Sequence, residues 1–338
     1  MPTSVQRDIT VIGGSAGSLA PLRELLGALP ADYPAAVFVV VHVAPEAPSI
    51  LPQILDRVSP LAVTVAQTGA RVRRGSVMVA PPDRHLVFDG DRIVLSRAAR
   101  ENRHRPSIDV LFRSAAVAFG ARVTGVVLSG MLDDGAAGLW AVKRRGGVAV
   151  VQDPDDAEYP DMPRHALAAV DVDHRLAVRD MAQTLLSFAP ERVVQSLAVP
   201  DNMASEVRMI VQDESSMGEL DAMGERVPLT CPECGGSLWE LGDPGPRYRC
   251  HVGHAYTLST LAAEQSMKVE AALWAGLRKL EESERLARRM ESHARANGND
   301  RHAAYHAELA QSSAAHAATL RELLTRHAAR TTDTAADE

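Results

Sequence analysis

Short apolar runs that alternate with segments of helical period occupy the first part of this 338-residue chain, and this alternation limits the fold more than any other feature. Residues 8–12 and 37–41 are continuous apolar, β-branched runs, as in strands buried on both faces. The same order of strand and helix resumes over residues 107–152. Strands that alternate with helices form a parallel sheet with helices on both faces. We therefore predict one doubly wound α/β domain over residues 5–192.

Residues 76–96 interrupt this alternation. Two short apolar runs flank an Asp-Gly pair at 89–90 there, which predicts an antiparallel hairpin. The expected fold is thus a mostly parallel sheet with an antiparallel hairpin portion.

The second part of the chain has a different composition. Residues 201–226 hold seven acidic side chains against two arginines, so we expect an acidic linker over 193–226, with a short helix as an option, that separates the α/β domain from the C-terminal segments. A cysteine-containing module is expected over 227–260, a helical hairpin over 261–330 and a disordered tail over 331–338.

The helical hairpin is predicted from two apolar patterns of nearly 3.5-residue period, which are broken at 297–300. We expect it to be a packing or dimerising element that supports a homo-oligomer, and a partner-docking surface is the alternative. The expected seam residues are Val269, Leu273, Leu277, Leu280, Leu286, Met290, Tyr305, Leu309, His316, Leu320, Leu323 and His327.

Composition excludes several classes of protein. The formal net charge of −7 argues against a broad nucleic-acid-binding surface. The longest apolar run, 35–41, is far shorter than the roughly 20 residues of a membrane span, so no membrane insertion is expected. The polar N-terminus has no signal-like apolar core, and we expect a cytoplasmic protein.

A glycine-rich turn follows the first predicted strand directly. Residues 13–17 read GGSAG, which fits G-x-S-x-G in a strand–turn–helix context. Such a turn exposes the serine side chain, and the helix N-terminus behind it offers N–H groups to developing negative charge. Ser15 is therefore a candidate nucleophile. A phosphate-binding loop is the alternative, although the spacing is G-G-x-x-G instead of G-x-G-x-x-G.

Two further polar positions follow predicted core strands. His42 ends the second apolar run, and Asp133 and Asp134 come shortly after a third. Taken singly, such a histidine is often structural, and paired aspartates at a helix start are usually N-caps. Because parallel strands end at one edge of their sheet, we expect Ser15, His42 and an aspartate to meet there. A nucleophile, a base and a buried carboxylate are the members of a hydrolytic triad.

Five sequence blocks occur in one order along residues 8–190. They are IGGSAG (12–17), VVH (40–42), APPDRHL (80–86), NRHRPSIDVLF (102–112) and SGMLDDGAAG (129–138). This part of the chain resembles the catalytic domain of the chemotaxis protein-glutamate methylesterases, the CheB type. The family hydrolyses γ-methyl glutamate esters on chemoreceptor helices and often deamidates glutamines there. The resemblance thus implies methylated chemoreceptor helices as partners and no cofactor for catalysis.

The resemblance also implies a role for each site residue. Ser15 is the nucleophile, His42 the general base and Asp134 the orienting carboxylate, whereas Asp133 is expected to be a cap. The backbone of Ala16 and Met131 is expected to supply the oxyanion donors.

This sequence departs from the family pattern in two ways. Ser18 stands where the family usually has glycine, a change that the helix start should tolerate. Family members commonly carry an N-terminal receiver domain that masks the site, and because the α/β pattern starts at residue 8 we expect that control to be absent. Arg103, His104 and Arg105 form a basic loop that either steers an acidic receptor surface or is simply solvated, and the two arginines are the candidate steering residues.

All cysteines of the chain, Cys231, Cys234 and Cys250, lie within 20 residues. C-x-x-C followed by glycine forms a knuckle, and a second knuckle at this distance completes a zinc-ribbon-like tetrahedron. We expect His254 as the fourth ligand in preference to His251, because Cys-x3-His matches a knuckle turn. A closed four-ligand site predicts a structural zinc, and three free thiols are the alternative.

Two functions of different classes remain open at this stage. The first is a methylesterase fused to a zinc ribbon and a helical hairpin. The second is a catalytically silent adaptor that docks receptors or a kinase and oligomerises through the hairpin. A nucleotide-binding enzyme is a distant third.

Overall fold

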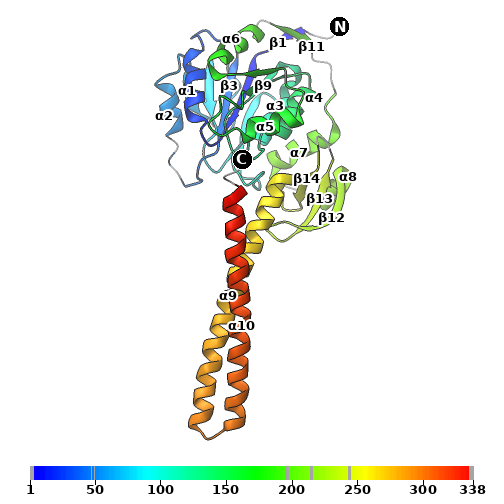
Figure 1. Cartoon of the computed structure of the whole chain (residues 1–338). Coiled ribbons are helices and arrows are strands. Elements are labelled where there is room, and N and C mark those ends of the chain that lie inside the picture. Colours follow the sequence, from blue (N-terminus) through cyan, green and yellow to red (C-terminus); the bar gives the residue numbers. More distant parts are fainter. Residues whose placement is uncertain are drawn as a thin grey trace. The chain divides into compact units, whose positions relative to one another are not determined.

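The computed structural model describes residues 4–334 apart from 47, 49, 190, 195–197, 214–215 and 243–244. The chain divides into two compact units, Met1–Leu261 and Ala262–Glu338 (Figure 1). The first unit contains the α/β domain and the cysteine-containing module, and the second consists of helices.

A seven-stranded sheet forms the centre of the first unit, and every neighbouring pair of its strands is parallel. The strand order is β10-β9-β8-β2-β3-β5-β4. Their bounds are β2 (Ile9–Gly14), β3 (Ala36–Val41), β4 (Ala62–Val65), β5 (Ser76–Val79), β8 (Val123–Val127), β9 (Val148–Gln152) and β10 (His174–Leu176). The chain leaves β2 on one side to form β3 and returns on the other side as β8, so the strand order reverses at β2.

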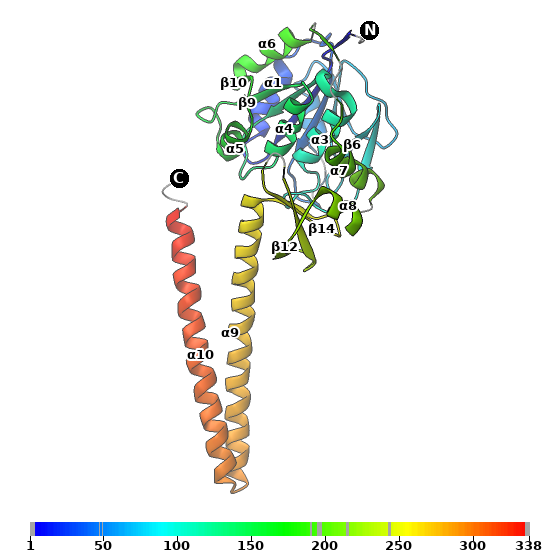
Figure 2. The same cartoon turned by 90° about the vertical axis from the view of Figure 1, so that its right-hand side faces the viewer.

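Helices cover both faces of this sheet (Figures 1 and 2). One face packs against α1 (Leu19–Ala28), α2 (Leu51–Asp56) and α6 (Val178–Phe188), and the other against α3 (Ile108–Phe119), α4 (Ala136–Arg144) and α5 (Asp161–Ala169). A short 3-10 turn, Gly120–Arg122, follows α3. The side chains of β3 alternate between the hydrophobic cores on the two faces of the sheet. Val39 packs with the first set of helices, and Phe38 packs with the second. The predicted doubly wound α/β fold is confirmed.

The predicted hairpin is formed by β6 (His85–Asp89) and β7 (Arg92–Ser96), and it makes a two-stranded sheet apart from the main one. Phe88 on β6 contacts Phe38 and Phe119 edge-on, with ring centroids 4.7 and 5.0 Å apart. The hairpin therefore closes the core around α3. A second small sheet, β1 (Ser4–Gln6) with β11 (Arg192–Val194), was not predicted.

The segment expected as an acidic linker contains two helices instead, α7 (Asp201–Gln212) and α8 (Met217–Met223). Apolar residues of α7 recur at helical spacing and are buried, and Val207 and Ile210 pack with Val87 of β6 and Val110 of α3. The sequence analysis relied on the charge count of this segment and did not recognise that one face of the helix is apolar. Because α7 packs on the α/β domain, the cysteine-containing module is not held at a distance from that domain.

The module itself is a four-stranded antiparallel sheet of β12 (Gly224–Thr230), β13 (Ser237–Leu241), β14 (Arg247–Cys250) and β15 (Ala255–Thr257). Tyr248 and Tyr256 lie in its small core. The side chain of Trp239 lies outside this core and packs against Met209 of α7 and Leu220 of α8. The module thus packs on the α7–α8 segment.

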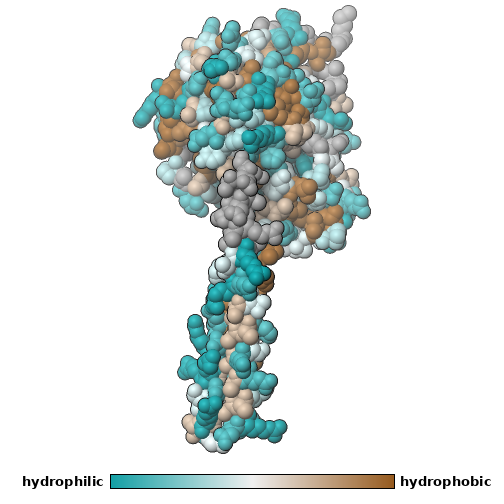
Figure 3. Space-filling view, viewed as in Figure 1, coloured by the Kyte–Doolittle hydropathy of each residue, from teal (hydrophilic) through white to brown (hydrophobic). Residues whose placement is uncertain are grey.

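The second unit contains most of α9 (Leu258–Ala296) and all of α10 (Asp300–Thr334), which form the predicted helical hairpin. Four residues of the predicted seam, Leu273, Leu277, Leu280 and Leu320, pack in one cluster with Ala317 and Leu324. The rest of the seam differs from the predicted one, because alanines at seven-residue spacing are buried and let the helices approach closely. The buried apolar residues are Leu277, Ala287, Ala294, Ala303, Ala310, Ala317 and Leu324, whereas Val269, Leu286, Met290, Tyr305, Leu309, His316 and Leu323 are exposed, and the side chain of His327 lies outside the described ones. Figure 3 shows hydrophilic side chains over much of the visible hairpin surface.

The expected tail begins inside this hairpin. Residues 331–334 belong to α10, and residues 335–338 lie outside the described residues. Within the part of the chain that the structure describes, no helix has the length and apolar character needed to span a membrane.

Candidate active site and metal centre

Three polar residues lie just beyond the carboxyl ends of neighbouring strands at the centre of the sheet. Ser15 follows β2, His42 follows β3 and Asp134 lies beyond β8. These strands are adjacent in the order β8-β2-β3. The sheet therefore brings together three residues that are distant in sequence.

Ser15 sits in the turn between β2 and α1. Its backbone N–H donates to the carbonyl oxygen of Ser129 at 2.9 Å, which ties the turn to the end of β8. Gly17 has a φ of +69°, and a Cβ there would lie 2.8 Å from both Ser129 Oγ and the Tyr159 ring, so this position requires glycine. Ser18 has a φ of −80°, which any residue adopts, and its Oγ donates to the Ser15 carbonyl at 2.6 Å.

His42 connects the other two residues. Its Nδ1 lies 3.1 Å from Ser15 Oγ, and its Nε2 lies 2.8 Å from Asp134 Oδ2. Its side chain is 6% exposed. A proton on Nε2 that is held by the carboxylate leaves Nδ1 as an acceptor toward the serine hydroxyl. The three predicted residues thus form one continuous hydrogen-bonded chain.

Asp134 is buried and accepts hydrogen bonds on both carboxylate oxygens. Its donors are His42 Nε2 and Ile108 N on Oδ2, and Asn102 Nδ2, Ser107 Oγ and Asp109 N on Oδ1. Burial alone would raise the pKa of Asp134, but the hydrogen bond and charge of His42 and the Ile108 N–H outweigh it and hold the pKa below its usual range. The carboxylate therefore stays ionised beside the imidazole.

The N-terminus of α3 supplies much of this environment. The backbone N–H groups of Ile108 and Asp109 point at Asp134 from the first turn of the helix, where the helix dipole favours an anion. Asp109 lies beside it, and burial followed by the charges of Asp134 and Glu101 raises the pKa of Asp109 well above its usual range. Two carboxyl groups with pKa values displaced in opposite directions share this site.

A sequence model of the CheB methylesterase family matches residues 10–185, which include all three residues of the hydrogen-bonded chain. The chain belongs to the CheB methylesterase family.

Individual CheB relatives match the same part of the chain. A protein-glutamate methylesterase/protein-glutamine glutaminase of Bordetella parapertussis is 37% identical over 196 residues, which are 56% of this chain and 56% of that one. A relative in Leptospira interrogans, named for the same two activities, is 36% identical over 186 residues, 55% of this chain and 96% of that one. The solved structure of the Thermotoga maritima CheB methylesterase catalytic domain matches with a TM-score of 0.52 and 30% identity, over 54% of this chain and 99% of that one.

The loop that precedes α3 contributes two residues to the CheB site: Asn102, to which the sequence analysis gave no role, and His104, which it placed only in a basic loop. Asn102 is 2% exposed and donates to Asp134 Oδ1 at 3.1 Å and to Asp109 Oδ2 at 2.7 Å. The ring of His104 stacks on the ring of His42. Both residues stand in one of the five blocks that identified the family, but that block does not show that they are buried beside Asp134 and His42. A buried polar role leaves no periodic signal in the sequence.

The two arginines of this loop differ from each other. Arg105 is bound to Asp83 through Nε at 3.0 Å and Nη2 at 2.7 Å, and its Nη1 donates to the carbonyl oxygens of Arg97 and Ala98. Arg105 thus holds the loop in place and is not simply solvated, and its steering role stays a prediction. Arg103 is half-buried, and its steering role stays a prediction.

Asp133 is not the side-chain cap that the sequence suggested. Gly135 occupies the N-cap position of α4, and there is no capping hydrogen bond from a side chain at this helix start, where every residue is described. The Asp133 carboxyl is buried, and its Oδ1 has no hydrogen-bond partner within the described residues. Burial raises the pKa of Asp133.

The expected oxyanion donors are the backbone groups of Ala16 and Met131. Ala16 follows Ser15 in the turn after β2, and Met131 lies in the turn after β8. Gly130 lies between the two turns, and a Cβ there would lie 2.8 Å from Ser15 Cβ and 2.0 Å from the Met162 sulfur. This contact brings the turn after β8 close to Ser15. The assignment of the Ala16 and Met131 backbone groups as oxyanion donors stays a prediction.

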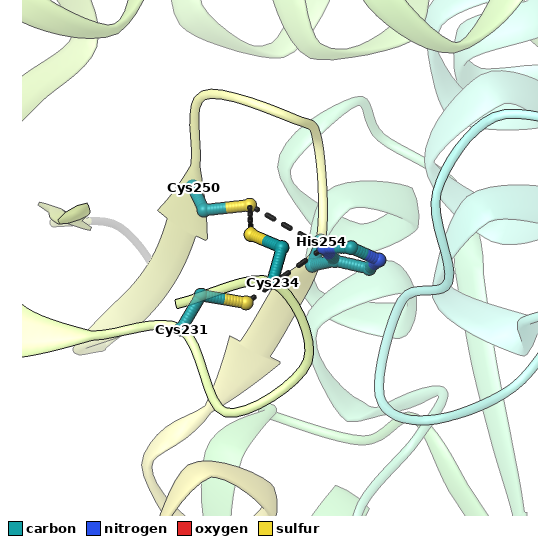
Figure 4. Close-up of side chains that lie close together, drawn as sticks. All are labelled: Cys231, Cys234, Cys250 and His254. Carbon is teal, nitrogen blue, oxygen red and sulfur yellow. Dashed lines mark hydrogen bonds between the residues drawn. The ribbon is translucent and has the colours of Figure 1, made fainter. Parts of the chain in front are cut away.

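Outside the CheB domain, the cysteine-containing module brings together Cys231, Cys234, Cys250 and His254 (Figure 4). The Sγ atoms of Cys234 and Cys250 are 3.7 Å apart, and His254 Nδ1 lies 3.7 Å from Cys231 Sγ and 3.5 Å from Cys250 Sγ. A tetrahedral ion with bonds of about 2.0–2.3 Å requires ligand separations of this size. The four residues are therefore near enough to bind one metal ion.

His254, and not its neighbour His251, belongs to this group. His251 is exposed and lies against Gly236. The free ring nitrogen of His254, Nε2, lies 3.3 Å from the carboxylate of Glu233, the kind of outer contact that orients a metal-binding imidazole. The residues present thus fit a metal centre.

Proposed function

We propose that this chain is a cytoplasmic serine esterase that removes methyl esters from glutamate side chains of chemoreceptors. The observation that supports this proposal most strongly is the hydrogen-bonded chain from Ser15 Oγ through His42 to Asp134 Oδ2. Membership of the CheB methylesterase family supports the same substrate class.

The proposed reaction has two halves. Ser15 Oγ attacks the ester carbonyl while its proton passes to His42 Nδ1, and the resulting imidazolium protonates the leaving methoxide, which departs as methanol. Water then attacks the acyl-enzyme, with His42 again accepting the proton, and glutamate and Ser15 are released. Asp134 holds the imidazole in the required tautomer and stabilises its charged form.

The backbone N–H groups of Ala16 and Met131 are the proposed donors to the oxyanion that forms in each half. They belong to loops whose positions are fixed by the Ser15–Ser129 hydrogen bond and by the close contact at Gly130. A carboxamide can replace the ester in the same steps, with ammonia as the leaving group. We therefore include glutamine deamidation as a second proposed activity, which is also in the name of the Bordetella relative.

The proposed ligand of the Cys3His group is a structural zinc ion. Three thiolates and one imidazole are the donor set that zinc prefers, and four protein ligands leave no coordination position for a reacting water. No step of the proposed reaction involves this ion.

The proposed oligomer is a self-associated form that uses the helical hairpin. Large apolar side chains are exposed on the second unit, namely Met267, Val269, Trp274, Leu286, Met290, Tyr305, Leu309 and Leu323. Sedimentation equilibrium of the full chain and of a Leu286→Glu variant tests this, since a monomeric wild-type protein would contradict it.

The experiment that separates the esterase from a silent adaptor compares Ser15→Ala with a control, Ser187→Ala on α6, whose hydroxyl only contacts the Thr184 carbonyl. We expect methanol release from methylated receptor, and labelling by a fluorophosphonate, in the wild type and in Ser187→Ala. Ser15→Ala should lose at least about 10³-fold in rate while remaining folded. Equal methanol release by Ser15→Ala would exclude the mechanism, and no release by folded wild type would favour the adaptor.

A further inference from the structure

The cysteine-containing module contacts the loop that lies behind the catalytic carboxylate. The Asn102 backbone N–H donates to the Ala255 carbonyl at 2.8 Å, and the Ala255 N–H donates to the Arg100 carbonyl at 3.2 Å. Residues 100–102 therefore extend the edge of the module's sheet alongside β15. Ala255 directly follows His254, one of the four candidate metal ligands.

Asn102 links this edge to the active site with its side chain. Its amide nitrogen donates to Asp134 and Asp109, and its amide oxygen accepts from the Thr257 N–H at 3.1 Å and the Thr260 hydroxyl at 3.3 Å. Both donors and both acceptor positions of the amide are thus used, one pair toward the carboxylates and the other toward the module. An aspartate or an alanine could not make this connection.

The backbone of Asn102 has a φ of 51°, in the left-handed region. That conformation is disfavoured for a residue with a Cβ, so it needs external contacts to persist. The contacts that hold it come from β15 and from the start of α9, within the first unit.

The same loop carries His104. The backbones of Glu101 and His104 exchange hydrogen bonds of 3.3 and 3.1 Å, which closes a tight loop, and the His104 ring lies on His42. Holding one side of the loop against β15 therefore fixes the other side against the general base.

A buried ion cluster attaches the module at this point. Arg249, which precedes Cys250, donates to Glu101 Oε2 at 2.9 Å, and Glu101 also accepts from Arg113 of α3. All three side chains are 5% exposed or less. Between the two candidate ligands Cys250 and His254, the Cys250 N–H donates to the His254 carbonyl at 2.9 Å. The position of β15 is thus tied to the geometry of the metal centre.

We propose that the metal-bound Cys3His module acts as a brace on the catalytic carboxylate, with Asn102 as the positioning residue that connects them. Loss of the metal releases His254 and β15, which frees Asn102 and His104 and lowers turnover without removing any catalytic residue. The proposal rests on the esterase function proposed above. It gives the module a regulatory role, because zinc availability then sets the activity of the CheB domain.

The test measures kcat and KM for methanol release in the full chain, before and after removal of the metal by a chelator and after addition of zinc. We expect kcat to fall at least about tenfold on stripping with KM within about twofold, and to return with zinc. Asn102→Ala should have a lowered kcat when loaded, and stripping should lower it little further, since the connection is already cut. Unchanged wild-type kcat on stripping, or multiplicative losses in Asn102→Ala, would overturn the proposal.

A second readout does not depend on activity. Amide hydrogen exchange across residues 100–109 should become faster in stripped protein and return to its loaded rate with zinc. If loaded wild type releases no methanol, the esterase function fails, and this exchange readout still decides whether the module braces the loop. Unchanged protection of residues 100–109 would then overturn the brace.

If removal of the metal unfolds the α/β domain, the test uses metal-loaded variants in place of metal-free protein. Thr260→Val removes one hydroxyl donor from the Asn102 amide, and Thr184→Val, whose hydroxyl bonds only the Asp180 carbonyl within α6, is the matched control. We expect a several-fold lower kcat in Thr260→Val and a broader acid limb in its pH profile, with Thr184→Val equal to wild type. Identical kcat and pH profiles in the two variants would contradict the proposal.

Discussion

The imidazole of His104 lies flat against that of His42, with ring centroids 3.5 Å apart and an angle of 10° between the planes. Burial, and then the positive charge of His42, lowers the pKa of His104 to about 4. His104 is therefore neutral at physiological pH. A neutral ring at this distance restricts the tilt of His42 without opposing the charge that His42 acquires when it accepts the serine proton.

This stacked pair predicts a pH dependence of stability. An unfolded chain protonates His104 below about pH 6.5, whereas the folded chain does so only near pH 4, so stability falls as the pH is lowered between these values. The loss should amount to about 3 kcal/mol at most. His104→Phe keeps an aromatic ring that does not titrate and should lose less stability. Urea unfolding of both proteins at pH 7.5 and 4.5 measures the difference, and parallel losses would contradict the assignment.

The two adjacent aspartates should differ sharply in their effect on rate. Asp134→Asn replaces an oxygen acceptor with a donor among the N–H and O–H groups that face it, and it removes the charge that orients His42, so we expect a fall in kcat of about 10⁴-fold. Asp133→Asn should stay close to wild type, because burial already favours the neutral form of that carboxyl. Steady-state methanol release gives both values. A larger effect at Asp133 would reverse the assignment of the third triad member.

One zinc ion per chain is the expected metal content of protein purified without chelator. Cys234→Ser should lose this zinc, because four ligands are needed to close the tetrahedron. Since the module packs on α7 and on residues 100–102, the thermal transition of the α/β domain should also move to lower temperature. Elemental analysis and calorimetry provide the two measurements. A metal-free wild type, or an α/β transition unaffected by Cys234→Ser, would be inconsistent with this arrangement.

The buried ion cluster gives a prediction for stability. Glu206 of α7 is 1% exposed and binds Arg247 through two hydrogen bonds of 2.8 and 2.9 Å, and Arg113 and Arg249 lie within 3.4 Å of it. Glu206→Gln would remove the carboxylate bound by Arg247 and leave Arg113 and Arg249 to share Glu101 alone among the carboxylates of this cluster. Three guanidinium groups would then face one carboxylate in a largely buried place, so we expect a loss of about 3–5 kcal/mol in the free energy of unfolding.

The control for this change is Glu24→Gln on the exposed surface of α1, which should stay within about 0.5 kcal/mol of wild type. Denaturant unfolding at pH 7 compares the two. Equal stabilities of the variants would show that the cluster does not fasten α7 and the module to the α/β domain.

The alanine seam of the helical hairpin predicts a strong dependence on side-chain size. Ala310 is 1% exposed, and Ala310→Leu should destabilise the hairpin by about 1–3 kcal/mol through overpacking. Ala318→Leu makes the same change on the exposed face of α10 and should be neutral or slightly stabilising. Thermal unfolding followed by circular dichroism separates them. Tolerance of leucine at Ala310 would indicate that the helices do not meet along the alanines.

The order of strands and helices could be predicted because it depends on local patterns, and so could the meeting of Ser15, His42 and Asp134. Each of these residues immediately follows a hydrophobic run or the short turn after it, and parallel strands end at one edge, so the three had to be neighbours once the strands were adjacent. The grouping of the four candidate metal ligands could also be predicted, because they belong to two short knuckles. The ligands are Cys231, Cys234, Cys250 and His254.

The sequence by itself therefore determined the α/β architecture, the three residues of the hydrogen-bonded chain and the four candidate metal ligands. Only the tertiary structure decided that α7 packs on the domain, that Arg105 is bound to Asp83, and that Asn102 connects the metal-binding module to Asp134. The physical reason is the separation along the chain of the residues that interact. Periodicity and turn chemistry are properties of a few consecutive residues, whereas a buried amide or guanidinium finds its partner in a distant segment, as Asn102 does in Thr260, 158 positions away.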